Sequence, residues 1–293
     1  MVLIRFFTLY NLNNMKRLLF IELQKIWKNK ASKILTISYF VLLSFIALIA
    51  SIEFNIGSFK LHIAEQGIFN FPYIWHFNTY IAAILKFFLA IVIVSMMANE
   101  YSYGTLKQNL IDGLSKKEFV LSKFLTVVVF AAGSTLFVFI MSLILGFSFS
   151  SYTEFSIVFS DLEYLLAYFV KLVAFFTFCL FLGILVKRSA FAIGFLFVWN
   201  VLETILKGVL NFKVFPESST AENITQFLPL ESMSNLIVEP FTRLSVIKNI
   251  ETAIGGEGFG KDYSVHFTGI LIVMAWTFIF LFFSYRILEK RDL

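Results

Sequence analysis

The chain has 293 residues, of which 59% are hydrophobic and 15% are charged, and its formal net charge is +5. Soluble domains carry about 25% charged residues, so this composition excludes an ordinary soluble domain and favours a chain that lies in a lipid bilayer. A single cysteine, Cys179, excludes an intrachain disulfide.

The first predicted element is an amphipathic helix over Met15–Lys30. Apolar residues recur there at spacings of three and four, and basic or polar residues fall on the other side: Met15, Leu18, Leu19, Leu23, Ile26 and Trp27 against Arg17, Gln24, Lys25 and Lys28. An apolar stripe with a basic face suits a helix that lies on anionic lipid headgroups. The alternative is a positively charged flank that only orients the first span.

Six continuous apolar runs follow, each near the ~20 residues that a helix needs to cross a bilayer. The runs are Ile34–Ile52, Thr79–Ala98, Phe124–Phe147, Tyr164–Val186, Ala190–Leu210 and Phe267–Ile287. The strands of a membrane barrel would alternate apolar and polar residues, and these runs do not. The predicted fold class is therefore an all-α integral membrane protein with six transmembrane helices and an N-terminal amphipathic interfacial helix.

The distribution of Lys and Arg orients these spans. The connections 1–33, 99–123, 187–189 and 288–293 hold 15 of the 24 Lys and Arg residues, whereas 53–78, 148–163 and 211–266 hold five. The first set is expected to be cytoplasmic, because inner connections carry the excess of positive charge. The positive charge thus indicates a membrane surface rather than nucleic acid. We expect a multi-pass protein of the cell membrane with both termini in the cytoplasm. Its domains are an N-terminal cytoplasmic segment, 1–33, and a six-helix domain, 34–293.

The cytoplasmic connection after the second span has the signals of an ordered segment. Gly104 can end the incoming helix, and Thr105 can cap a short helix over Thr105–Ile111. Ser115 and Glu118 have the spacing of a capping box, in which each side chain bonds the other residue's backbone N–H. A short helix held between two spans can transmit a push from a soluble partner into the bilayer. The alternative is an ordinary ordered loop.

The same connection carries the residues of a resemblance to a known family. It reads Asn-Glu-Tyr-x-x-Gly-Thr-Leu-Lys from Asn99 and Ser-Lys-Lys-Glu from Ser115, followed by Lys123, and the chain ends in Glu-Lys-Arg-Asp-Leu. With six spans and a basic amphipathic start, the chain resembles the ABC-2-type permeases, the membrane subunits of ATP-binding-cassette (ABC) exporters. Lys116 stands where the family pattern has Arg, which keeps the charge but loses the bidentate fork.

The resemblance implies a permease subunit that exports a substrate while separate cytoplasmic ABC ATPase subunits bind and hydrolyse ATP. The family's coupling helix maps onto Thr105–Ile111, and its loop glutamate maps onto Glu100. The residues expected at the contact with the ATPase are Glu100, Gly104, Thr105, Leu106, Leu110, Ser115, Lys116 and Glu118. The other expected partners are a second permease copy or paralogue and the lipid bilayer, with no nucleic acid and no cofactor of the chain's own.

The long outer connection 211–266 contains a segment that imitates an ATP-binding loop. Gly255–Lys261 matches most of that loop, but Asp262 stands where Ser or Thr should hold magnesium, and no buried strand precedes it. We interpret it as a turn, so no ATPase motif is expected in this chain. Leu230–Glu239 and Phe241–Ile254 are predicted as two short interfacial helices, and the alternative is a partly ordered loop.

Four charged side chains lie within the predicted spans, where a charge costs ~2.5–3.5 kcal/mol. Lys86, Lys171 and Glu203 each lie seven residues from the outer end of a span, about 10 Å deep. Lys207 lies on the same helix face as Glu203. We expect one polar cluster in which Glu203 pairs with Lys86 or Lys171, and the surplus positive charge suits an anionic substrate or lipid headgroup. The alternative is that the lysines snorkel to the outer headgroups.

Two other classes of function remain for a chain with six spans. A membrane-embedded enzyme needs paired His, Asp, Glu or Cys residues at catalytic depth, whereas the predicted spans hold no His, no Asp and one Glu. A secondary transporter is expected to show repeats or helices interrupted by Gly and Pro, and neither is evident. His62, His76 and His266 are scattered over outer connections, so neither catalytic residues nor a metal site are expected.

Overall fold

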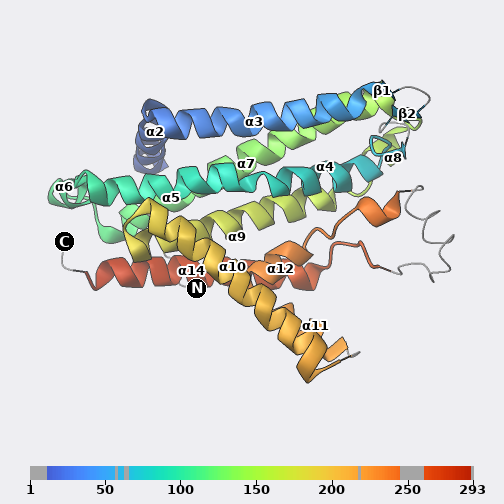
Figure 1. The fold of residues 1–293 in the computed structure, drawn as a ribbon. Coiled ribbons are helices and arrows are strands. Elements are labelled where there is room, and N and C mark those ends of the chain that lie inside the picture. Colours follow the sequence, from blue (N-terminus) through green and yellow to red (C-terminus); the bar gives the residue numbers. More distant parts are fainter. Residues whose placement is uncertain (1–11, 57–58, 63–65, 217–218, 245–260, 292–293) are drawn as a thin grey trace.

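The computed structural model describes residues 12–56, 59–62, 66–216, 219–244 and 261–291, and most of its long helices run side by side (Figure 1). The long helices are α2 (Leu12–Lys28), α3 (Lys30–Ser51), α4 (Tyr73–Ile84), α5 (Lys86–Ser102), α7 (Lys116–Phe149), α9 (Glu163–Val186), α10 (Ser189–Val209) and α14 (Phe267–Glu289). The short elements are β1 (Glu53–Ile56), β2 (Phe59–His62), α6 (Thr105–Ile111), α8 (Phe155–Val158), the π-helical turn η2 (Leu210–Val214), α11 (Ser219–Thr225), α12 (Pro229–Asn235) and the 3₁₀ turn η3 (Phe241–Arg243).

Within the described residues, five helical segments are long and apolar enough to cross a membrane, and the bent pair α4–α5 adds a sixth if it is one span. The five contain α3, α7, α9, α10 and α14. This confirms the prediction of a helical protein with several apolar spans. The largest difference in boundaries is at α7, which has 34 residues and is therefore about 50 Å long. Because the hydrocarbon core is ~30 Å thick, α7 must extend well beyond it.

The second predicted span consists of two helices instead of one. The 12 residues of α4 and the 17 residues of α5 meet at Leu85 with a bend of 45°. Neither Pro nor Gly lies at the break, so the usual sequence signals of a kink are missing. As the first residue of α5, Lys86 lies near the middle of the bent span and is deeper than the sequence pattern predicted.

A short hairpin interrupts the predicted all-α fold. β1 and β2 pair antiparallel, with Glu53 opposite His62 and Ile56 opposite Phe59. The hairpin follows α3 directly and lies near α8 at one end of the bundle (Figure 1). We call this end the hairpin end. The opposite end carries α2, α6 and the last turn of α14, and we call it the α6 end.

The connection between α10 and α14 contains α11, α12 and η3. The first of the two predicted interfacial helices corresponds to α12, which is shorter than predicted and packs against α9 and α14. Of the second, Phe241–Ile254, the structure describes only the turn η3 and Leu244. The remainder of that prediction, and residues 255–260 of the glycine-rich segment, lie outside the described residues.

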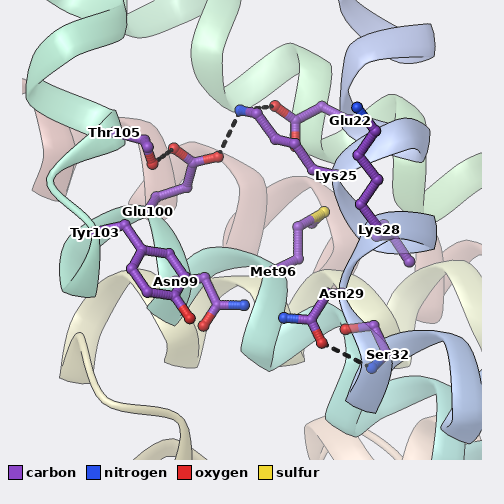
Figure 2. Close-up of a pocket in the computed structure, with 11 residues that line it drawn as sticks. Glu22, Lys25, Lys28, Asn29, Ser32, Met96, Asn99, Glu100, Tyr103 and Thr105 are labelled. Carbon is purple, nitrogen blue, oxygen red and sulfur yellow. Dashed lines mark hydrogen bonds and ion pairs between the residues drawn. The ribbon is translucent and has the colours of Figure 1, made fainter.

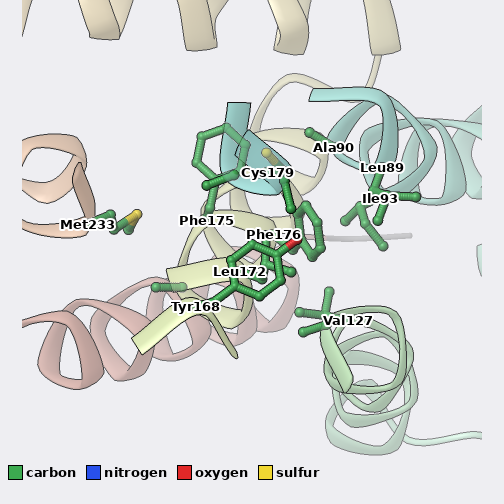
Figure 3. Packing of buried hydrophobic residues seen from close by; sticks show 14 of the residues in the cluster. Leu89, Ala90, Ile93, Val127, Tyr168, Leu172, Phe175, Phe176, Cys179 and Met233 are labelled. Carbon is green, nitrogen blue, oxygen red and sulfur yellow. The ribbon is translucent and has the colours of Figure 1, made fainter. Parts of the chain in front are cut away.

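The central helix of the bundle is α9, which contacts α4, α5, α7, α10 and α14. Most of its side chains are buried. In Figure 3, Leu172 and Phe176 of α9 belong to the same buried cluster as Ile93 of α5 and Val127 of α7. α9 is surrounded by other helices, whereas α3 and α10 expose much apolar surface. Through its contacts with α5, α7 and α10, α9 positions helices that carry the charged side chains described next.

Candidate functional site

The connection between α5 and α7 is a tight turn followed by α6 at the α6 end. Gly104 has φ 69°, a left-handed conformation that favours glycine. The helix spans Thr105–Ile111, as the sequence predicted. The predicted cap is wrong, because Gly104 occupies the capping position. Thr105 instead donates from Oγ1 to Oε2 of Glu100 at 2.5 Å.

The start of α7 confirms the predicted capping box. Ser115 Oγ accepts a hydrogen bond from the Glu118 backbone N–H at 3.2 Å, and Glu118 Oε2 accepts one from the Ser115 backbone N–H at 2.7 Å. Such a box satisfies two N–H groups that the first turn of a helix leaves free. It therefore fixes where α7 begins and where α6 can lie.

Glu100 belongs to a buried ion cluster, which we define as Glu22, Lys25, Glu100 and Lys123. Lys123 is fully buried and donates from Nζ to Glu22 Oε2 and Glu100 Oε1, both at 2.5 Å. Lys25 Nζ lies 3.0 Å from Glu22 Oε1 and 2.9 Å from Glu100 Oε1. The two carboxylates and the two ammonium groups balance each other, which buried charges require.

The ion cluster joins elements that are far apart in the chain. Glu22 and Lys25 come from α2, Glu100 from α5 and Lys123 from α7, while Thr105 of α6 binds the same Glu100 carboxylate. Burial disfavours the charged form of Lys25, but the nearby carboxylates of Glu22 and Glu100 outweigh burial and raise its pKa. A movement of α6 would therefore act on α2, α5 and α7 together.

A pocket of about 350 Å³ opens beside the ion cluster, between α2 and α5 (Figure 2). Asn29 lies on its wall and separates α2 from α3, because its Oδ1 accepts a hydrogen bond from Ser32 N at 3.0 Å. The chain turns at this residue, so α2 lies across the direction of α3 (Figure 1). Of the predicted apolar stripe, Ile26 is buried against the bundle while Trp27 is exposed.

The outward face of α6 differs from the one predicted. Leu106 is only 2% exposed, and Leu110 is partly buried against the same core. Both leucines therefore anchor α6 to the bundle and are not free to meet a partner. The exposed side chains of α6 are those of Lys107, Gln108 and Ile111, and Ile111 is 70% exposed.

The end of the chain folds back onto this region. Arg291 donates to two carbonyl oxygens in the last turn of α9, that of Ile184 at 2.5 Å and that of Leu185 at 2.9 Å. Carbonyls in that position have no partner within their own helix. Lys116 donates to the carbonyls of Glu289 and Arg291, at 3.0 and 2.8 Å. The loop and the tail that carry the resemblance are thus in contact. The two carbonyl oxygens are separate acceptors, which a lysine ammonium group can bind without the bidentate fork of an arginine.

The charges predicted to form one polar cluster are distributed differently. Glu203 pairs with neither Lys86 nor Lys171; its carboxylate accepts hydrogen bonds from the backbone N–H groups of Leu230 and Glu231, both at 3.0 Å. These groups are free because they lie in the first turn of α12. The predicted pairing was wrong because α12 offers Glu203 donors that no pattern in α10 reveals.

Two lysines complete the contacts around α12. Lys207 forms an ion pair with Glu231 near the start of α12, and Lys171 Nζ donates to Ser234 O, near its end, at 3.3 Å. A carboxylate at the N-terminus and an ammonium group at the C-terminus both match the helix dipole. Lys86 makes no contact of this kind among the described residues.

Replacing Glu203 by Ala should lower the stability of the protein by about 2 kcal/mol, because it leaves buried N–H groups at the start of α12 without an acceptor. Thermal unfolding of the purified chain in detergent measures this effect. Glu222, which is exposed on α11, provides the control, and Glu222→Ala should change little. An equal and small effect of both substitutions would refute the anchoring role of Glu203.

The sequence reading missed Glu22, which the structure places inside the ion cluster. A signal was available, since Glu22 lies four residues from both Leu18 and Ile26 and therefore on the apolar stripe of α2. An acidic residue on such a stripe requires a buried cation. That cation is Lys123, which the resemblance had marked only as part of a motif.

The geometry defines a class: a helical protein with several helices long and apolar enough to span a membrane, and an ionic site that joins α2, α5, α6 and α7 at one end. Among the described residues, no group of His, Cys, Asp and Glu could hold a metal ion. The family described as "Protein of unknown function (DUF2705)" matches residues 52–293, so the chain belongs to this family. The match includes Glu100 and Lys123 but not α2. None of the curated proteins compared with the chain matches it.

Proposed function

We propose that this protein is the membrane subunit of an ABC exporter of the ABC-2 type, which moves a substrate outward with energy from a separate ATPase. The observation that carries the proposal is α6. It is a short helix between two spans, with an exposed outer face and an inner face bound to the buried ion cluster. Because Thr105 of α6 binds Glu100, a displacement of α6 would be transmitted through Glu100 to α2, α5 and α7.

The proposed partners are two cytoplasmic ATPase subunits and a second permease, either another copy or a paralogue. ATP would be bound by the ATPase subunits alone. Closure of these subunits would move α6, and the helices joined by the ion cluster would then move relative to α9. The α6 end would face the cytoplasm, because its connections carry most of the Lys and Arg residues.

This orientation predicts the outcome of reporter fusions. Alkaline phosphatase fused after Leu293 should be inactive, because the C-terminus would be cytoplasmic, whereas the same enzyme inserted at Ser151, between α7 and α8, should be active. Activity assays on intact cells measure both fusions at matched expression. The reverse pattern of activity would overturn the orientation.

A secondary transporter is the second candidate, and the bend between α4 and α5 favours it. Secondary transporters bind substrates and ions at helices that are broken near the middle of the membrane. The two candidates differ in their energy source. Transport that needs an ion gradient and no ATPase would favour the secondary transporter.

The proposed function is tested by purifying the full chain from membranes of its own host in mild detergent. The preparation should contain an ATPase subunit and hydrolyse ATP in a vanadate-sensitive manner. The same purification from cells that lack the ATPase subunit should show no hydrolysis. A preparation that contains no ATPase and still transports after reconstitution would contradict the proposal.

A further inference from the structure

Among the described residues, two lysines inside the bundle have no carboxylate beside them. Lys86, at the break between α4 and α5, has its Nζ 4.4 Å from the ring centroid of Phe175 on α9. Lys171 lies four residues before Phe175 on the same face of α9, and its charge is within electrostatic range of Lys86. Each lysine therefore adds to the positive potential at the other.

Within the part of the chain that the structure describes, no acidic side chain offsets these two charges. Glu203 binds the start of α12, and Lys171 reaches only a carbonyl oxygen, that of Ser234. Among the described residues, Lys86 forms no ion pair, and its contacts are the rings of Phe175 and Phe87. The N-terminus of α5 adds partial positive charge at the same place.

Further basic residues lie toward the hairpin end. His76 of α4 is within electrostatic range of Lys171, and its Nδ1 lies 3.2 Å from the Arg243 guanidinium. Glu239, which is also near His76, is occupied by an ion pair with Lys261. Arg243, Lys171 and Lys86 thus form a row of cations from the turn η3 to the middle of the bent span, and His76 beside Arg243 is a neutral imidazole, because its Nδ1 accepts a hydrogen bond from the guanidinium.

A row of this kind is costly unless an anion offsets it. One charged lysine within hydrocarbon costs ~2.5–3.5 kcal/mol, and two like charges cost more. The surroundings of Lys86 are apolar, and its neighbours Ile84 and Phe87 are exposed on the side of the bundle, where lipid would lie. An anion that reaches Lys86 from this side needs an apolar part that is stable in lipid.

We propose that Lys86 and Lys171 bind the negatively charged group, a phosphate or a carboxylate, of an amphiphilic substrate that enters from the lipid. This inference deepens the proposed export function, because it names the charge and the character of the substrate. Its test measures binding to the chain alone, so a failure here is distinct from a failure to find an ATPase.

Native mass spectrometry of the full chain, purified from bilayers of phosphatidylcholine with a minor share of phosphatidylglycerol, tests the proposal. The wild type should retain phosphatidylglycerol in preference to phosphatidylcholine. The double variant Lys86→Gln/Lys171→Gln should lose this preference at least tenfold, whereas Lys171→Arg should keep it. The double variant Lys213→Gln/Lys290→Gln is the matched control, because both lysines are exposed and their loss removes the same two charges without touching the pair.

A second measurement separates binding from folding. Lys86→Met should fold with unchanged or higher thermal stability in phosphatidylcholine, because it removes an uncompensated charge, and it should still lose the lipid preference. Equal retention of phosphatidylglycerol by the wild type and the double variant would overturn the proposal. Stabilisation by inorganic phosphate as large as that by phosphatidylglycerol would overturn the amphiphilic substrate in favour of a soluble anion.

Discussion

Replacing Lys123 by Met should lower the free energy of unfolding by about 3–5 kcal/mol, the largest stability effect expected for any single substitution at the α6 end. Lys123 is fully buried, and its ammonium group is 2.5 Å from carboxylate oxygens of both Glu22 and Glu100. Removing one partner of a buried ion pair leaves an uncompensated charge, and that is the source of the cost. Lys25 remains, but one half-exposed cation cannot balance two buried carboxylates.

Thermal unfolding in detergent and the yield of folded protein measure this loss. The double variant Lys123→Met/Glu22→Gln restores the charge balance and should recover part of the lost stability. Lys107→Met is the control, because Lys107 is exposed on α6 and far less should depend on it. If Lys123→Met were no more harmful than Lys107→Met, the ion cluster would not be the link that joins α2 to α5 and α7.

Replacing Ile111 by Asp should reduce ATP-driven export at least tenfold while the chain remains stable and inserted. Ile111 is 70% exposed on α6, so the new carboxylate meets water in the isolated chain and costs little folding energy. In the proposed complex it would be buried against the ATPase subunit, where an unpaired charge is unfavourable. The sequence alone pointed to Leu106 and Leu110, but Leu106→Asp would damage folding, because Leu106 is buried.

Export by reconstituted complexes, measured together with their ATP hydrolysis, tests this expectation. Ile224→Asp is the matched control, because Ile224 is an exposed isoleucine on α11, away from α6. It should leave both activities near wild type. A complex with Ile111→Asp that exports at the wild-type rate would remove α6 from the path of coupling.

Local signals predicted much of the fold. Five of the six apolar runs correspond to single long helices, because every backbone group within lipid must be bonded within its own helix, so length and hydropathy indicate them. The bounds of α6 and the Ser115–Glu118 box were also predictable, because caps act over three residues of sequence. The long apolar helices of such a protein can therefore be recognised in its sequence alone.

The contacts of the charged side chains were not predictable in this way. Glu203 appeared to need a lysine, yet its donors are Trp199, four residues before it, and backbone groups of α12, 27 and 28 residues away in the chain. Glu22 and Lys123 are 101 residues apart, and nothing in either helix identifies the other. The break at Leu85 contains neither Pro nor Gly, the residues that usually mark a kink in the sequence. These features depend on how helices pack, which periodicity does not specify.

Photocrosslinking from α6 tests the central claim most directly. A photoreactive amino acid at position 111, in the full chain within membranes of its own host, should crosslink to one protein, and mass spectrometry should identify it as an ATP-binding subunit. The same amino acid at Phe212, which is exposed in η2, should not label that subunit. Crosslinks from position 111 that contain only lipid, or a protein without an ATP-binding site, would contradict the account.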